Sequence, residues 1–300
     1  MNKQAVGLYI NFPQDGTKRK WNSMKKDLRI WALMSPLLIT TVLLTNGCGS
    51  KSAAELAAEA AAAAAAVIAA NDAKLTSCIV GSWQFSTTYQ TVNPVFNTDG
   101  TYVTKKAPIS PAINYSYESG TWTISNGSIA LIKQKETSGY PTDAATAESS
   151  AQSIAAADQT RNESALLCND TKLGISLVFS GGNESTYEGT WTQIAANKDY
   201  KQVDGAFKLA EEEITTYTFN ANQTGTIVYT DSDWEDNGIY KATPDIDVYT
   251  FKICSWSFSG AVFTYTSVLD TATCPSTNGT QTNNFEMIDG KLVFYPYTKQ

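Results

Sequence analysis

The densest group of carboxylates in the sequence lies in the segment Asp231-Ser-Asp233-Trp-Glu235-Asp236-Asn-Gly238. Alternate carboxylates on a loop offer the hard oxygen ligands that Ca²⁺ prefers, so Asp231, Asp233 and Glu235 are candidate ligands. The calcium loop of EF-hands does not fit, because its glycine position holds Asp236 and its final glutamate position holds Ala242. We therefore expect a solvated hairpin loop here, with a cation site as the alternative.

Catalytic chemistry has little support in this sequence. The chain contains no histidine, which removes His-based triads, imidazole acid–base catalysis and histidine metal sites. No Gly-x-Ser-x-Gly elbow is present. Paired carboxylates could hydrolyse glycosides, but the sequence does not place two of them together. We expect a protein that is not an enzyme and needs no cofactor.

The N-terminal 47 residues have the pattern of an export signal. A short basic segment begins at Met24 and is followed by an apolar run from Ile30 to Leu44, after which small residues lead to Cys48. This is the order of a secretory signal peptide, and the apolar run is shorter than the roughly 20 residues of a spanning helix. A single membrane-anchor helix is the alternative. Residues 1–23 fit no signal pattern, so we expect translation to start at Met24.

The end of this leader, Leu44-Thr45-Asn46-Gly47-Cys48, resembles the lipobox of bacterial lipoproteins, in a relaxed form like that of spirochaetes. The usual leucine lies three residues before the cysteine, where this chain has Thr45. The resemblance implies cleavage after Gly47 and acylation of Cys48, including palmitate. It implies a chain attached by its acyl groups to the bacterial cell envelope, at the outer membrane, with exposure on the cell surface as a further expectation. An ordinary disulfide is the alternative for Cys48.

Four cysteines remain: Cys78, Cys168, Cys254 and Cys274. An even number in an exported chain predicts two disulfides, for which three pairings exist. We favour Cys254–Cys274, because these residues flank an expected hairpin, and Cys78–Cys168 then follows by elimination. Zinc is disfavoured, because the chain has neither a CxxC spacing nor a histidine.

The charge balance excludes one class of partner. Residues 1–47 hold seven of the 22 Lys and Arg and two of the 29 Asp and Glu, which leaves a net charge of −12 beyond Gly47. Phosphates would be repelled, so we expect no nucleic-acid partner. Solubility is the simplest reason for this acidity.

A tether is expected directly after Cys48. Thirteen of the eighteen residues from Ala53 to Ala70 are alanine, the best helix former. Ser52 and Glu55 have the spacing of a capping box, and Asn71-Asp72 marks an expected end. With few large apolar side chains, the helix is typical of a semi-rigid spacer. An oligomeric coiled coil is the alternative.

From Cys78 onward the pattern has period two, which predicts strands. Asp99-Gly100, Asn126-Gly127 and Asp289-Gly290 are hairpin turn signals. Three landmarks recur in order, which predicts an internal duplication unless β-meanders resemble each other by chance. They are Gly81-Ser-Trp83 with Gly189-Thr-Trp191, Val95-Phe96-Asn97 with Thr218-Phe219-Asn220, and Gly120-Thr-Trp122 with Cys254-Ser-Trp256.

Gly-x-Trp opening an antiparallel meander, followed by Phe-x-x-Asp-Gly-Thr, resembles lipocalin-like proteins. The resemblance implies small barrels in which Trp83 and Trp191 close one end; simple core aromatics are the alternative. We expect a mainly β fold, an antiparallel meander of one or two small barrels or sandwiches, preceded by the Ala-rich helix.

The expected organisation is an extension (1–23), a signal peptide (24–47), a lipidated tether (48–77), a first β unit (78–140), a polar linker or loop (141–170) and a second β unit (171–300). The favoured function is a non-catalytic module that binds a small apolar ligand inside a barrel or a protein partner. A surface adhesin or structural envelope protein is the first alternative, and a carboxylate hydrolase the second. An apolar-ligand binder requires an open barrel, whereas a surface interactor has a filled core.

Overall fold

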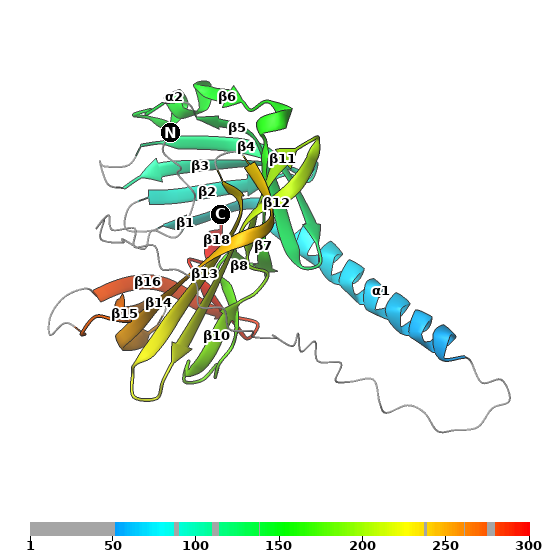
Figure 1. Ribbon diagram of the computed structural model, residues 1–300. Coiled ribbons are helices and arrows are strands. Elements are labelled where there is room, and N and C mark those ends of the chain that lie inside the picture. Colours follow the sequence, from blue (N-terminus) through cyan, green and yellow to red (C-terminus); the bar gives the residue numbers. More distant parts are fainter. Residues whose placement is uncertain are drawn as a thin grey trace. The chain divides into compact units, whose positions relative to one another are not determined.

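The computed structural model of the chain describes residues 52–86, 90–109, 114–137, 139–236, 239–260, 262–274 and 280–300, without the side chains of Thr280 and Gln281. These residues belong to one unit, Ser52–Gln300. The fold is mainly β, as the alternating pattern predicts, and the helix α1 (Ala53–Ile79) precedes the strands (Figure 1).

The strands pair antiparallel into two closed rings of eight, which are called the first and the second ring below. Neighbouring strands of the first ring, in order, are β1 (Gly81–Ser86), β2 (Gln90–Phe96), β3 (Thr101–Pro108), β4 (Ser116–Ser125), β5 (Ser128–Thr137), β7 (Thr160–Cys168), β8 (Lys172–Ile175) and β18 (Tyr297–Lys299). Because β18 pairs with both β8 and β1, the C-terminal strand closes this ring.

The second ring contains eight further strands. In order, they are β9 (Val178–Gly181), β10 (Gly189–Gln193), β12 (Ala206–Phe219), β13 (Gly225–Asp236), β14 (Ile239–Ser259), β15 (Val262–Leu269), β16 (Thr280–Ile288) and β17 (Lys291–Phe294). The strand β17 pairs with β9 and completes the circle. A barrel leaves few strand edges unpaired, which is how antiparallel sheets of this size avoid exposed backbone groups.

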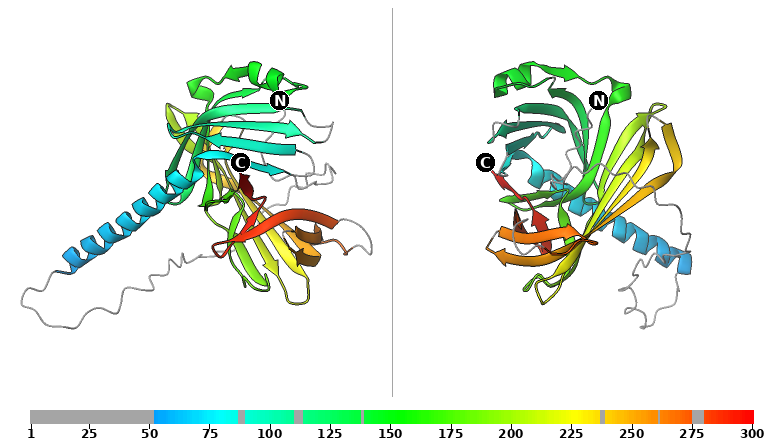
Figure 2. Two further views of the ribbon diagram at one scale, coloured as in Figure 1. Left: turned by 180° about the vertical axis from the view of Figure 1, so that it is seen from behind. Right: turned by 60° about the vertical axis from the view of Figure 1, so that its left-hand side comes forward.

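Short elements connect and extend the rings. They are α2 (Ala144–Ser149), β6 (Ala151–Ser153), the 3₁₀ turn at Ala156–Asp158, and β11 (Asn197–Val203). The strand β11 pairs with β7 of the first ring and β12 of the second, so the two rings share one continuous sheet (Figure 2). A small buried cluster of Ala165, Val178, Ile288 and Val293 also joins strands of both.

The helix is longer than the sequence predicts. It runs past Asn71-Asp72 to Ile79, so Cys78 lies in its last turn and not in a strand. Leu75 and Ile79 are four residues apart, share one face of the helix and are buried in the first ring's core. Burial of this pair extends the helix beyond its polar stop signal.

The predicted linker 141–170 is largely structured. Its second half forms β7, a central strand of the first ring, in which Ala165, Leu166 and Cys168 are buried. The first β unit therefore extends beyond residue 140, and β8 and β18 also belong to it. The first five residues of β7, Thr-Arg-Asn-Glu-Ser, are all polar, so the sequence gives no alternating strand pattern there.

Candidate functional site

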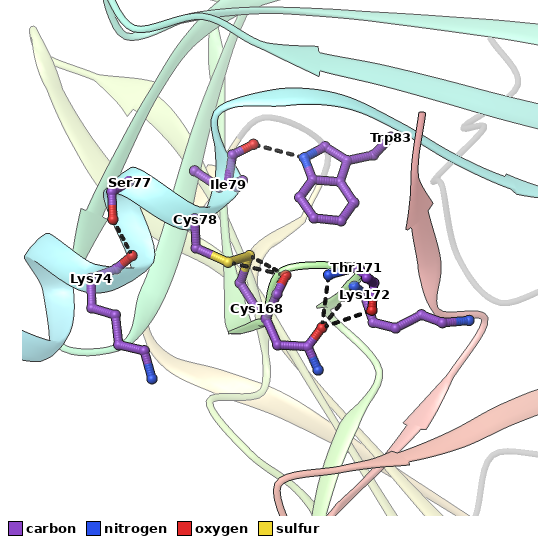
Figure 3. The surroundings of a disulfide bond; sticks show 9 residues. Lys74, Ser77, Cys78, Ile79, Trp83, Cys168, Thr171 and Lys172 are labelled. Atoms are coloured by element: carbon purple, nitrogen blue, oxygen red, sulfur yellow. Dashed lines mark hydrogen bonds between the residues drawn. A yellow bond between two sulfur atoms is a disulfide. The ribbon is translucent and has the colours of Figure 1, made fainter.

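The tether meets the first ring at a covalent junction. Cys78 in the last turn of α1 forms a disulfide with Cys168 at the end of β7, as predicted (Figure 3). The carbonyl oxygen of Asn169 lies 3.3 Å from Cys78 Sγ, and its side-chain Oδ1 accepts the backbone N–H groups of Thr171 and Lys172. The turn that presents Cys168 is thereby held in shape beside the helix.

A carboxylate forms the second contact of this junction. The two oxygens of Asp72 accept the backbone N–H groups of Asn126 and Gly127, at 2.9 and 2.8 Å. Asn126 and Gly127 have positive φ angles, as the Asn-Gly hairpin signal between β4 and β5 predicts. Asp72 therefore binds the tip of a neighbouring hairpin and does not end its own helix.

Beyond the junction the helix is exposed. Residues from Ala53 to Asn71 contact little of the described chain, apart from a partly covered Ala60. Ser52 and Glu55 form the predicted capping box, with Glu55 Oε2 accepting the Ser52 N–H at 2.6 Å. By length and composition alone, α1 could also cross a membrane. Gly47 and Cys48, the predicted cleavage and lipidation residues, lie outside the described residues.

Trp83 and Trp191 occupy equivalent places in the two rings. Both are fully buried, Trp83 in β1 and Trp191 in β10, and Gly81 and Gly189, two residues earlier, pair with Phe96 and Phe219. Each indole N–H donates to a carbonyl four residues upstream: Trp83 to Ile79 at 2.7 Å, and Trp191 to Tyr187 at 2.9 Å. The two tryptophans are core residues with the same local geometry.

A second pair of tryptophans extends this equivalence. The indole of Trp122 donates to the Thr101 carbonyl, and that of Trp256 donates to the Thr224 carbonyl, both at 2.9 Å. In the preceding turns, Asp99 and Asn222 accept from the hydroxyls of these threonines, both at 2.7 Å. The matching turn in the second ring therefore ends at Thr224, which lies five residues after Phe219 as Thr101 lies five residues after Phe96. Repetition of the same hydrogen bonds supports the predicted duplication.

The interior of the second ring is filled by side chains. Phe219, Phe258 and Phe263 pack within 5.7 Å of one another by ring centroid. Around them lie further buried residues: Phe179, Trp191, Tyr217, Ile227, Ile253, Trp256, Tyr265, Phe285, Leu292 and Phe294. The first ring holds a comparable cluster. Large aromatic and aliphatic side chains thus occupy interior positions of both rings.

The expected hairpin loop is wrong for Asp231, Asp233 and Glu235, the candidate ligands of the alternative cation site, because all three lie in β13. The carboxylate of Glu235 forms an ion pair with Lys201, so Glu235 is no longer a candidate ligand. Among the described residues, no group of three acidic or cysteine side chains is placed to hold a metal ion. The long ladder between β12 and β13 extends through both acidic segments and overrides their low strand propensity.

These carboxylates instead form an acidic face on the extension of β12, β13 and β14 beyond the ring. Residues paired across antiparallel strands share a face, and so do residues two apart in one strand. The acidic face consists of two cross-strand rows, Asp199–Glu211–Asp233–Asp245 and Asn197–Glu213–Asp231–Asp247. On β12 the same face continues from the core residues Phe219, Tyr217 and Thr215.

Like charges in the acidic face change its protonation. Burial, together with Asp231, Glu213 and other carboxylates, raises the pKa of Glu211 to about 7. Burial also raises the pKa of Asp199, although a hydrogen bond from Asn162 opposes the effect. Tyr229 donates its hydroxyl to Glu213 at 2.6 Å. The face is thus an array of carboxylates, and at its border Lys241 forms an ion pair with Asp245.

A buried glutamine separates the acidic face from the apolar core. Gln193 Oε1 accepts the backbone N–H of Thr215 at 3.0 Å, and Gln193 Nε2 donates to the Ser176 carbonyl at 2.8 Å. This side chain substitutes for a strand partner where β10 ends and β11 has not begun.

The chain was compared with protein-family models, curated proteins and solved structures, and none of the three comparisons found a match.

Proposed function

We propose that the protein is a lipid-anchored, exported envelope protein. In this proposal acyl groups on Cys48 hold the chain at the membrane, and α1 carries a pair of packed β-barrels as a non-catalytic interaction module. The anchor itself rests on the lipobox resemblance of Leu44 to Cys48. Three acyl chains, as lipoproteins usually carry, bind far more firmly than the marginal attachment of one.

The observation that carries the proposal is the exposed and firmly attached α1. Its first turn begins five residues after Cys48, and its C-terminal part is joined to the first ring by Cys78–Cys168 and by Asp72. Exposed residues over about 18 positions, at about 1.5 Å each, would hold the barrels about 27 Å from the lipid. A helix attached at one end and bare at the other suits a spacer.

The filled cores favour interaction at the outer surface. A barrel that encloses a small apolar ligand needs interior volume, whereas here the interior positions carry large aromatic side chains. Binding in this proposal therefore involves strand edges, loops and the acidic face. The module meets a protein partner outside the cytosol.

Detergent phase partition tests the anchor. The full-length chain is expressed in a bacterium that processes lipoproteins, beside Cys48→Ala. We expect the first in the detergent phase and in the membrane fraction, and an unprocessed precursor for the variant. Equal amounts of both chains in the aqueous phase, or a processed variant still held in the membrane through α1, would overturn the proposal. A fluorescent fatty acid should gain no signal with either chain.

A further inference from the structure

The first half of β14 is an open strand edge. From Phe251 to Ile253 β14 pairs with β13 on one side and β15 on the other, but between Ile239 and Thr250 it pairs only with β13 among the described strands. This half lies at the border of its sheet (Figure 2, right). An unpaired edge of this length is a template for the addition of another strand.

The backbone groups on this edge can be assigned. The carbonyl of Thr250 accepts the N–H of Asp270, at 3.1 Å, on the side from which β15 approaches. Alternate residues of a strand direct their N–H and C=O groups to the same side. Val248 and Ile246 therefore present theirs to the open edge. Pro244, which has no N–H to donate, lies in the register shift just before Asp245.

The side chains along the edge differ sharply between its two faces. Ile246 and Val248 are 60% and 59% exposed on the outer face of the sheet. Asp245 and Asp247 lie on the opposite face, where they are the last members of the two rows of the acidic face; Asp245 also forms an ion pair with Lys241. An incoming strand would thus meet carboxylates on one side and exposed branched aliphatic side chains on the other.

This charge pattern selects the occupant. A second copy of the chain added at the same edge would place its own Asp245 and Asp247 beside these rows, and like charges on neighbouring strands are destabilising. A strand with cations on that face would extend both rows with opposite charge. Apolar side chains at the alternate positions would cover Ile246 and Val248.

We infer that residues 245–249 of β14 are a docking edge for an extended segment of a partner protein, with lysine or arginine alternating with apolar residues. Main-chain hydrogen bonds to Ile246 and Val248 provide the pairing, and the acidic face provides the selectivity. The inference gives the interaction module of the proposed function a partner class. It rests on that proposal only for the location of the partner.

Binding of a synthetic peptide tests the docking edge. The probe is a capped peptide of about eight residues that alternates lysine and valine, and its control carries glutamate in place of lysine. Calorimetry uses the full chain in detergent and, separately, full-length Cys48→Ala. Both chains should bind the lysine peptide, so failure of the anchor and failure of docking are read separately. Equal binding of the glutamate peptide would overturn the inference.

Two variants of the edge make the test specific. The pair Asp245→Asn with Asp247→Asn should weaken binding about tenfold, since two facing charges are lost. Asp170→Asn with Glu184→Gln removes the same charge from exposed positions elsewhere and should leave binding unchanged. Val248→Pro removes an outward N–H and should abolish binding, with circular dichroism as the check on folding.

Hydrogen exchange locates the bound peptide. The amides of Ile246 and Val248 should exchange more slowly in the complex, while those of β15 stay unchanged. Protection elsewhere without protection at these amides would overturn the inference. So would a concentration-dependent dimer that the peptide does not dissociate, because it would place a second copy on this edge.

Discussion

The two rings share the same pattern of tryptophan hydrogen bonds, and they differ in the elements that pack against their ends. In the first ring, Ile79 at the end of α1 supplies the carbonyl for the Trp83 indole; in the second, the loop residue Tyr187 supplies it for Trp191. Tyr187 then stacks on Phe258 at 4.0 Å, so an aromatic pair takes the place that the helix occupies in the first ring. At this position the first ring receives the end of the tether, whereas the second ring receives a residue of its own loop.

The opposite ends differ as well. The second ring's strands β12, β13 and β14 continue well beyond the core as the acidic face and the open edge, whereas the short strands β8 and β18 close the first ring. This comparison indicates a division of tasks. In the proposed function, the first barrel is the one attached to the tether, and the second presents the acidic face and the open edge to a partner. The predictions below test that division.

The largest expected effect comes from the disulfides. Cys78–Cys168 spans 90 residues and Cys254–Cys274 spans 20. Closing these loops stabilises the fold by about 4–5 and about 3 kcal/mol in the chain-entropy model. Replacing both cysteines of one pair by serine should therefore cost more for the first pair, measured by equilibrium urea unfolding. A larger loss for the second pair would contradict the view that the junction holds the first ring.

A close contact in the second ring comes next. A Cβ added to Gly182 would lie 2.2 Å from the Trp191 indole, whereas one added to Gly260 would meet nothing within 4 Å. The two glycines have nearly equal positive φ angles, 58° and 57°, so backbone strain is matched. Gly182→Ala should cost about 2–3 kcal/mol more than Gly260→Ala in thermal unfolding. Equal losses would show that the indole can move.

These contacts show how far sequence reasoning reaches. Local signals succeeded: the Ser52–Glu55 capping box, the Asn126-Gly127 turn and the pairing of Cys254 with Cys274 are all present. Each depends on residues close in the chain or on a single crosslink.

Most signals that depend on distant partners failed, although elimination gave the Cys78–Cys168 pair correctly. Asp72 reads as a helix stop, but it binds a hairpin 54 residues away. The carboxylates of β13 read as a hairpin loop, although the ladders with β12 and β14 hold them extended. The acidic face exists only through pairing among four strands, so no single segment could indicate it. Nothing in the segment around Asp72 indicates that its carboxylate binds the hairpin tip at Asn126 and Gly127.

The Asp72 contact has a moderate expected effect. Asp72→Asn leaves one acceptor oxygen for the two N–H groups of Asn126 and Gly127, which should cost about 1–2 kcal/mol. Exchange of these two amides should accelerate, and limited proteolysis should cut earlier near Lys74. Asp158→Asn, an exposed carboxylate in the 3₁₀ turn before β7, is the control. No change at the hairpin amides would mean that Asp72 does not fasten the tether.

The smallest effect concerns pH and the second barrel. Glu211 has a folded-state pKa of about 7 against an ordinary 4.5, so the folded chain holds a proton that the unfolded chain has released between these values. The free energy of unfolding should therefore decrease as pH rises from about 4.5 to about 7. Glu211→Gln should flatten this slope and add about 1 kcal/mol above pH 7, after allowance for solvent screening.

Glu212 provides the matched control, because it lies on the opposite face of β12 and pairs with Lys198 at 3.4 Å. Thermal unfolding of Glu212→Gln across the same pH range should keep the slope of the unmodified chain. If the two variants behave alike, the carboxylates of the acidic face do not influence one another.

Metabolic labelling with radioactive palmitate, followed by intact-mass analysis, tests the anchor at Cys48 most directly. The account predicts label on the full-length chain, absence of label on Cys48→Ala, and a mature mass that begins at Cys48 with its acyl groups. An unlabelled full-length product that retains residues 24–47 would contradict it.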